Sequence, residues 1–165
     1  MKNINENTKK TMIENMALAT IILVVWFVCF SHTVAGSNSM YPLIKPGDHQ
    51  LYFKLTKNFK RGDIILFNHE DEINLGKRII GLPGDEISFH DGYVLINSKI
   101  LDESKYLDEN TETNCIETFI VPENAYFVLG DNRENSFDSR FYATPFVTNE
   151  EIIGKLIVNI PLGTN

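Results

Sequence analysis

A long apolar segment near the N-terminus constrains this chain more than any other feature of the sequence. Residues Met16 to Phe30 include no charged side chain, and Ser31 to Ala35 extend the segment to about the length that spans a bilayer. Apolar side chains would cover every face of this helix, which argues against a buried helix of a soluble protein. We therefore predict a transmembrane anchor over residues 16–35, preceded by a short disordered cytoplasmic tail over residues 1–15.

The alternative interpretation of this segment is a secretory signal that is removed after export. Lys2, Lys9 and Lys10 precede the apolar run, and the small residues around Ala35 form a weak cleavage site. Further basic residues follow the segment between Lys54 and Arg61, so charge alone leaves the orientation in the membrane open.

Length, charge and cysteine content narrow the classes that the remaining residues can belong to. The chain has 165 residues and a net charge of -7, which suits one catalytic domain over residues 36–165. No basic stripe is interleaved with aromatic residues, so we do not expect nucleic acid as a partner. Cys115 is the one thiol of this domain, because Cys29 lies in the apolar run, so no internal disulfide framework is possible there.

Short segments rich in β-branched and aromatic residues indicate a mostly β, antiparallel fold for this domain. Asp91-Gly92 between two such segments is typical of a β-hairpin with a type I′ turn. Turn signals recur too closely for intervening helices, which excludes alternating strands and helices. The acidic residues 101–118 lack periodicity and predict an exposed loop or small subdomain with solvated charges. The predicted strands are residues 50–55, 63–68, 78–81, 93–97, 125–129 and 151–160.

Several familiar catalytic motifs do not fit this sequence. His69-Glu70 begins like a zinc-protease helix, but Ile73 stands where the second histidine is needed. Arg133 occupies an oxygen-ligand position in a segment that otherwise resembles a calcium loop. We therefore predict no metal and no cofactor. The turn around Ser39 lacks the second glycine of a nucleophile elbow, so a Ser-His-Asp hydrolase is disfavoured. The four histidines, to which we assign no role, keep that class open: His32, His49, His69 and His90.

A serine and a lysine remain as a candidate catalytic pair. Ser39 lies in a polar turn just after the apolar segment, and its hydroxyl needs a base to become nucleophilic. Lys77 could be that base if burial lowers its pKa, and strand alternation would point Lys77 inward and Arg78 outward. Taken alone, each residue is more typical of a non-catalytic role, Ser39 as a turn residue and Lys77 as a surface charge.

Four segments in order change this balance, because together they resemble the signature boxes of type I signal peptidases. They are Ser39-Met40-x-Pro42, Arg61-Gly62-Asp63-Ile64, Lys77-Arg78-Ile79-Ile80-Gly81-Leu82-Pro83-Gly84-Asp85, and the segment from Gly130 to Arg140. The resemblance covers most of the chain. It implies the antiparallel sheets of the signal-peptidase fold with one N-terminal transmembrane helix.

The resemblance also implies a role for individual residues. Ser39 would attack the scissile carbonyl, neutral Lys77 would take its proton, and Ser136 would orient the lysine amine. The Ser37 hydroxyl and the backbone N–H of Ser39 would form the oxyanion hole. The supporting residues would be Asp131, Arg133, Asp138 and Arg140, and the substrate-binding residues Met40, Pro42 and Ile44.

Substrate, location and departures from the family follow from the same comparison of motifs. The implied substrates are secretory preproteins with small residues at the first and third positions before the cleaved bond. The implied location is the cytoplasmic (inner) membrane, in contact with lipid, as a single-pass protein with its catalytic domain on the outer face. Leu43-Ile44 stands where threonine and leucine are common, and Gly76 where a bulkier residue is usual.

Three rival functions are carried forward from the sequence. A specialised peptidase for pilin or conjugation proteins and a self-cleaving repressor belong to the same Ser-Lys clan. The membrane segment argues against the repressor, and the complete last box against the specialist. An inactive membrane-anchored scaffold would be expected to lack Ser39 or Lys77, and both are present.

Overall fold

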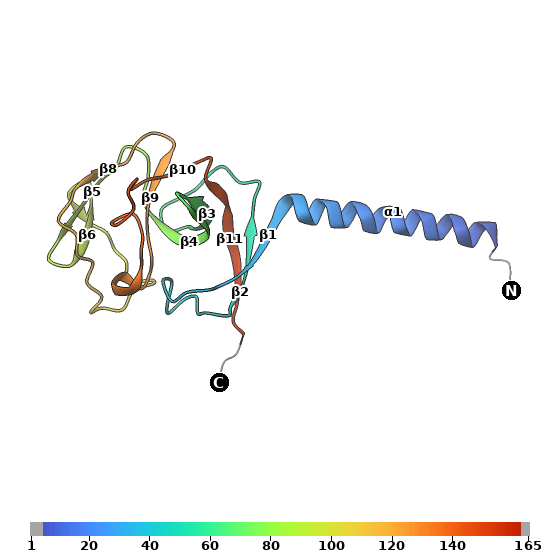
Figure 1. The fold of residues 1–165 in the computed structure, drawn as a ribbon, viewed down its shortest axis with the longest axis horizontal. Helices are drawn as coiled ribbons and strands as arrows, with labels where there is room; N and C mark the ends of the chain where they lie inside the picture. The colour runs from blue at the N-terminus through green and yellow to red at the C-terminus, as the bar shows by residue number, and fades with distance from the viewer. Residues whose placement is uncertain (1–4, 163–165) are drawn as a thin grey trace.

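The computed structural model describes residues 5–162 and consists of a β-rich body from which one long helix projects (Figure 1). Within these residues the sheets are antiparallel, so the mostly β fold with one N-terminal apolar helix is confirmed. The elements are α1 (Glu6–Cys29), β1 (Phe30–Val34), β2 (His49–Phe53), β3 (Ile64–His69), β4 (Glu72–Gly81), β5 (Glu86–His90), β6 (Tyr93–Ile96), β7 (Lys99–Ile100), β8 (Phe119–Ile120), β9 (Ala125–Leu129), the short 3₁₀ helix η1 (Arg133–Asn135), β10 (Val147–Thr148) and β11 (Ile152–Ile160).

The bounds of α1 differ from the predicted anchor at both ends. The helix begins at Glu6, after the Asn5 side chain accepts a hydrogen bond from the Asn7 amide, so residues 6–15 are helical where a disordered tail was predicted. Residues 1–4 of that tail lie outside the described residues. The helix ends at Cys29 because the chain becomes extended at Phe30 and pairs with β2. Residues 30–34 are therefore a strand and were wrongly included in the predicted helix.

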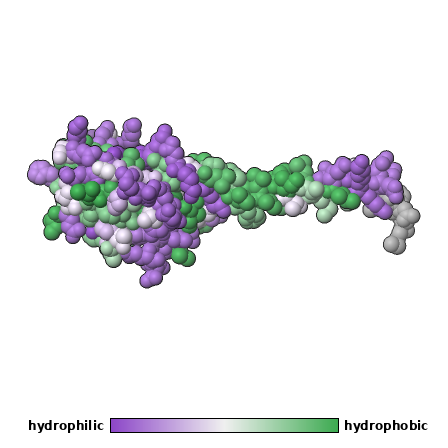
Figure 2. Space-filling view, turned by 90° about the horizontal axis from the view of Figure 1, so that it is seen from above, coloured by the Kyte–Doolittle hydropathy of each residue, from purple (hydrophilic) through white to green (hydrophobic). Residues whose placement is uncertain are grey.

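Helix α1 has the length and composition needed to cross a membrane, as a signal sequence near an N-terminus also would. None of its described residues is buried, and Figure 2 shows a continuous hydrophobic surface between the hydrophilic body and a hydrophilic N-terminal end. At the junction with the body, the Lys54 ammonium donates a 2.7 Å hydrogen bond to the Phe27 carbonyl. A cation at this position is favourable because the helix C-terminus carries partial negative charge.

The body contains two antiparallel sheets that share a hydrophobic core. The larger sheet has the order β1-β2-β11-β3-β4-β9-β10, and the smaller one has the order β7-β6-β5-β8. Because successive side chains of a strand point to opposite faces, Ile79 and Ile80 of β4 enter different clusters. Ile80 packs with Val94 and Phe119 of the smaller sheet, whereas Ile79 packs with Phe67 of the neighbouring β3 and other residues of the larger sheet.

The predicted hairpin is confirmed by the pairing of β5 with β6, from Ile87 opposite Ile96 to His90 opposite Tyr93. Asp91 and Gly92, which connect the strands, have φ angles of 50° and 82°. Positive φ at both central residues is what a type I′ turn requires, and Asp-Gly adopts it at low cost.

Candidate active site

The turn that carries Ser39 is held by hydrogen bonds within the turn and by hydrogen bonds from Asn132. Ser39 is 8% exposed, and its hydroxyl lies 3.1 Å from the Ser37 hydroxyl. The backbone amide of Asn132 donates to the Ser39 carbonyl at 3.0 Å, and the Asn132 side chain donates to the Asn38 carbonyl at 3.1 Å. The nucleophile candidate is therefore fixed to the loop after β9, which lies far away in the sequence.

Lys77 lies in the middle of β4 and is 4% exposed, as the alternation of this strand predicted. Burial lowers the pKa of Lys77 to about 8, because the charged ammonium loses hydration; the charges of Asp138 and Asp131 raise it and that of Arg140 lowers it. Ser39 Oγ and Lys77 Nζ are not hydrogen-bonded to each other in this structure, and the contact of Ser39 Oγ among described residues is Ser37 Oγ.

Arg78 lies on the opposite face of β4 but is not exposed, contrary to the outward position expected from the sequence. It is 7% exposed, because its guanidinium donates two hydrogen bonds to Asp131, at 2.8 Å and 2.6 Å, and a third to the Gly62 carbonyl at 2.7 Å. Burial raises the pKa of Asp131, and the paired Arg78 opposes that rise.

Gly130 allows the last sequence box, from Gly130 to Arg140, to pack against the turn that carries Ser39. A Cβ at this position would lie 2.2 Å from Ser136 Oγ and 2.4 Å from the Ser39 carbonyl oxygen, so no side chain fits there. Ser136 is 5% exposed, and within residues 5–162 its hydroxyl has no hydrogen-bond partner. A buried hydroxyl without a partner is rare and marks a place where a functional group can bind.

Asp138 and Arg140 form an ion pair within the segment from Gly130 to Arg140 that carries Ser136. The guanidinium donates to both carboxylate oxygens, at 2.8 Å and 2.9 Å, and Asp138 also accepts a hydrogen bond from the Gly130 amide at 3.1 Å. Arg140 in addition donates to the Arg133 carbonyl at 2.8 Å. These contacts fix the backbone on both sides of Ser136.

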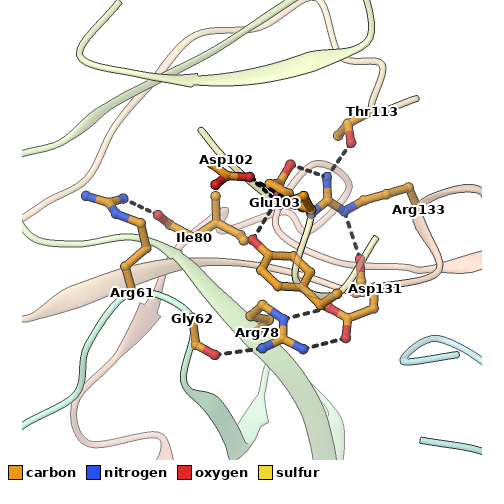
Figure 3. Close-up of polar contacts among 12 residues, drawn as sticks. Arg61, Gly62, Arg78, Ile80, Asp102, Glu103, Thr113, Asp131 and Arg133 are labelled. Carbon is orange, nitrogen blue, oxygen red and sulfur yellow. Dashed lines mark hydrogen bonds and ion pairs between the residues drawn. The ribbon is translucent and has the colours of Figure 1, made fainter. Parts of the chain in front are cut away.

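Arg133 connects the same loop to the acidic segment 101–118, as Figure 3 shows. Its buried guanidinium donates to the Gly130 carbonyl at 3.0 Å, to Glu103 at 3.1 Å and to the Thr113 hydroxyl. The solvated acidic face predicted for this segment is therefore wrong at Glu103, because its carboxylate is paired with a buried cation. The segment supports the loop that carries Ser136, which its composition alone did not reveal.

We expect the replacement of Glu103 by alanine to lower the free energy of unfolding by about 3 kcal/mol or more, because Arg133 would remain buried without a counter-ion. Urea unfolding of both proteins measures the difference. Glu109→Ala is the matched control, since Glu109 is exposed on the same segment and should change stability by less than about 0.5 kcal/mol. Equal effects of the two substitutions would contradict the buried-pair explanation.

An open cleft of about 560 Å³ runs between β1 and the N-terminal half of β4 and contains both candidate catalytic residues. Met40 and Ile44, predicted to bind substrate, line it, whereas Pro42 lines two neighbouring hollows instead. The cleft also includes residues that the sequence analysis did not assign to substrate binding: Thr33, Gln50 and Glu72 to Gly76. Those of β4 precede Lys77 in one strand, so an alternation analysis extended toward Glu72 would have found them.

One of the four histidines, His32, lines this cleft, and among the described residues His49, His69 and His90 do not. His69 is buried between the Glu151 carboxylate and the Thr144 carbonyl, at 2.7 Å and 2.8 Å. His32 and His49 contact each other at 2.8 Å on β1 and β2, and His90 lies beside Asp91. None of them hydrogen-bonds to Ser39 or Lys77. Within residues 5–162 no group of three potential metal ligands converges.

Comparison with known proteins identifies the class to which this fold and site belong. The family model described as signal peptidase, peptidase S26, matches residues 9–160. Signal peptidase I S of Bacillus subtilis (strain 168) is 37% identical over 158 residues, which cover 85% of this chain and 84% of the relative. The probable signal peptidase I-2 of Synechocystis is 35% identical over 160 residues, covering 90% and 70%.

A solved structure supports the same assignment. The crystal structure of a signal peptidase I from Enterococcus faecalis V583 is 33% identical and superimposes with a TM-score of 0.52, covering 61% of this chain and 98% of that one. The chain thus belongs to the signal peptidase I family of serine peptidases, as its sequence motifs predicted.

Proposed function

We propose that this protein is a membrane-anchored serine endopeptidase that removes N-terminal signal peptides from secreted preproteins through a Ser39–Lys77 dyad. The observation that carries the proposal is the burial of Lys77 in the same cleft as Ser39. A buried lysine with a pKa of about 8 is neutral in about a tenth of molecules one pH unit below that value, and the neutral form can accept a proton. Family membership and the motif positions of both residues support these roles.

In the proposed first step, Ser39 Oγ attacks the carbonyl carbon of the scissile bond while its proton moves to Lys77 Nζ. The tetrahedral intermediate collapses, the peptide C–N bond breaks, and Lys77 returns the proton to the leaving amine. The signal peptide is then esterified to Ser39. In the second step Lys77 takes a proton from water, and the hydroxide attacks the ester carbonyl carbon. The bond from that carbon to Ser39 Oγ then breaks, the signal peptide leaves with a C-terminal carboxyl group, and Ser39 regains its hydroxyl proton from Lys77.

Two further side chains complete the proposed mechanism. The Ser37 hydroxyl lies 3.1 Å from Ser39 Oγ, where it could donate to the oxyanion together with the Ser39 backbone N–H. The unpartnered, buried Ser136 hydroxyl is available to orient the neutral amine of Lys77. The Asp138–Arg140 pair and the Arg78–Asp131 pair hold the surrounding backbone and the opposite face of β4.

The junction between α1 and β1 favours a retained anchor over a cleaved leader. Cleavage after Ala35 would remove β1, whose five residues all pair with β2 in the larger sheet. We propose that α1 anchors the protein in the cytoplasmic membrane and that residues 36–165 act on its outer face. An enzyme held beside the bilayer meets a substrate tethered in the same bilayer at high effective concentration.

The geometry of the cleft is compatible with a substrate bound as an additional strand. β1 is an edge strand of the larger sheet, and the first half of β4 pairs with β3 alone, so both have free backbone groups facing the cleft. An extended peptide between them would place alternate side chains toward Met40 and Ile44. The family resemblance supports small residues at the first and third positions before the bond.

This proposal predicts that the full chain, reconstituted in lipid vesicles, cuts a preprotein after a small residue of its signal peptide. Mass spectrometry of the product identifies the bond. Tryptophan at the first or third position before the bond should block cleavage, because those side chains would face the cleft floor. Tryptophan at the second position is the control and should be tolerated. Failure to cut any preprotein, or indifference to all three substitutions, would overturn the proposed function.

A further inference from the structure

A buried amide, Gln50, lies in the floor of the cleft. Gln50 is 6% exposed and belongs to β2, where it lies opposite Thr33 of β1. It lines the same cleft as Ser39, Met40 and Lys77. A polar side chain in this position is informative because the rest of the floor between β1 and β4 includes the apolar side chains of Met40 and Ile44.

The hydrogen bonds of Gln50 use its oxygen and leave its nitrogen free. Gln50 Oε1 accepts a hydrogen bond from Thr33 Oγ1 at 3.1 Å and another from the Tyr52 hydroxyl at 2.9 Å. Tyr52 is fully buried, and burial raises its pKa, so the phenol remains protonated and can donate. Among residues 5–162 no acceptor for Gln50 Nε2 is found, and this nitrogen is not one of the fully buried atoms that lack a partner, so it faces the solvent of the cleft.

Gly76 makes this arrangement possible from the opposite side of the cleft. A Cβ at Gly76 would lie 3.3 Å from the Tyr52 hydroxyl oxygen, closer than an ordinary van der Waals contact. The bulkier residue that the resemblance led us to expect at this position would therefore press on the phenol that holds Gln50. The glycine and the tyrosine fit each other, and together with Thr33 they fix the amide with its nitrogen unpaired.

We propose that Gln50 selects preproteins with a hydrogen-bonding side chain, above all serine, at the third position before the cleaved bond. The inference rests on the proposed function and refines its substrate class. In an extended substrate the first and third side chains face the floor. Met40 adjoins Ser39 and lies nearest the first position. Gln50 lies opposite Thr33 of β1, which precedes the turn of Ser39, so we assign the third position to it.

Serine suits this position by both size and chemistry. Its side chain is small enough for a floor shared with Ile44, and its hydroxyl oxygen can accept the free Gln50 N–H. Alanine would fit the same space but would exclude water from that donor without replacing its hydrogen bond, and a donor left unpaired in this way destabilises the complex. A site built around a polar contact therefore discriminates against the analogue that lacks it.

The test compares two otherwise identical preproteins with serine or alanine at the third position. We expect kcat/KM for the serine preprotein to be about 3- to 10-fold higher with the natural chain. With Gln50→Leu the ratio should fall to one or below. The matched control exchanges alanine for serine at the second position, which faces away from the floor and should leave kcat/KM unchanged for both enzymes.

A second variant tests whether any loss of the serine preference comes from a folding defect. Gln50→Leu leaves the Thr33 and Tyr52 hydroxyls without their acceptor, whereas combining it with Tyr52→Phe removes one donor together with the acceptor. The double variant should melt close to the natural protein and should also lose the serine preference. A serine preference that persists in either folded variant, or a ratio of one in the natural chain, overturns the inference.

Measuring binding without cleavage tests this inference separately from the proposed function. Dissociation constants of the two uncut preproteins, measured on the full chain with Ser39→Ala, should show the same preference for serine and its loss with Gln50→Leu. If the natural chain cuts neither preprotein, the proposed function fails. The inference then still stands on a serine preference in binding that requires Gln50, and equal binding of the two preproteins overturns it.

Discussion

Replacement of Ser39 by alanine is expected to lower kcat for preprotein cleavage by about 10⁵-fold or more, because alanine has no hydroxyl to form the proposed covalent intermediate. Single-turnover assays with the vesicle-reconstituted chain measure the loss. Binding of the preprotein should change little, since the substitution removes one hydroxyl and leaves the β1 and β4 edges in place.

The matched control for this experiment is Ser88→Ala, which lies on β5 of the smaller sheet, outside the cleft. This variant should cleave at the natural rate. Substantial cleavage by a folded Ser39→Ala protein would remove Ser39 from the mechanism. Loss of activity in a folded His32→Ala or His69→Ala protein, with Ser39→Ala equally inactive, would instead revive a histidine-dependent hydrolase.

The activity is expected to follow the protonation state of Lys77. Because burial lowers the pKa of Lys77 to about 8, kcat/KM should rise about tenfold per pH unit below that value and level off above it. Lys77→Arg should abolish cleavage at every pH, because a guanidinium does not release its proton in this range. A rate that stays flat from about pH 6 to 9, a range that includes the pKa of about 8, would contradict a lysine base.

Stability measurements give an independent test of the same lysine. The folded state binds the Lys77 proton less tightly than the unfolded state, whose pKa is near 10.5. Stability contributed by this group therefore rises as pH increases from about 8 to 10.5, and the cost of burial is fully present below about pH 8. Lys77→Met should raise the free energy of unfolding by about 3 kcal/mol at neutral pH, with the gain disappearing toward pH 10.5. Lys57→Met, at an exposed position, is the control and should show no such gain.

The antiparallel fold was predictable because its signals are local. The Asp91-Gly92 turn and the β-branched segments around it act through neighbouring residues, and the structure places that hairpin where the sequence predicted it. The end of α1 was not predictable in the same way. Residues 30–34 are apolar enough to continue a helix, and their pairing with β2 depends on residues that follow much later in the chain.

The candidate site also includes residues that the sequence predicted and residues that it did not. The motifs identified Ser39, Lys77 and Ser136 by residue type and order, and the structure brings the turn of Ser39 and the loop of Ser136 together at Gly130. The motifs carried no information on Glu103, because an acidic residue in an acidic segment has no sequence signature that reveals a buried partner.

By itself, the sequence determined the family, the order of the catalytic motifs and the presence of one helix able to cross a membrane, since each depends on residue identity and local spacing. Only the tertiary structure decided which polar groups are buried and which of them are paired. The pKa of Lys77, the support of Arg133 by Glu103 and the free amide of Gln50 all depend on side chains from separate strands and loops. Desolvation and hydrogen bonding act through space, so these properties exist only once the chain has folded.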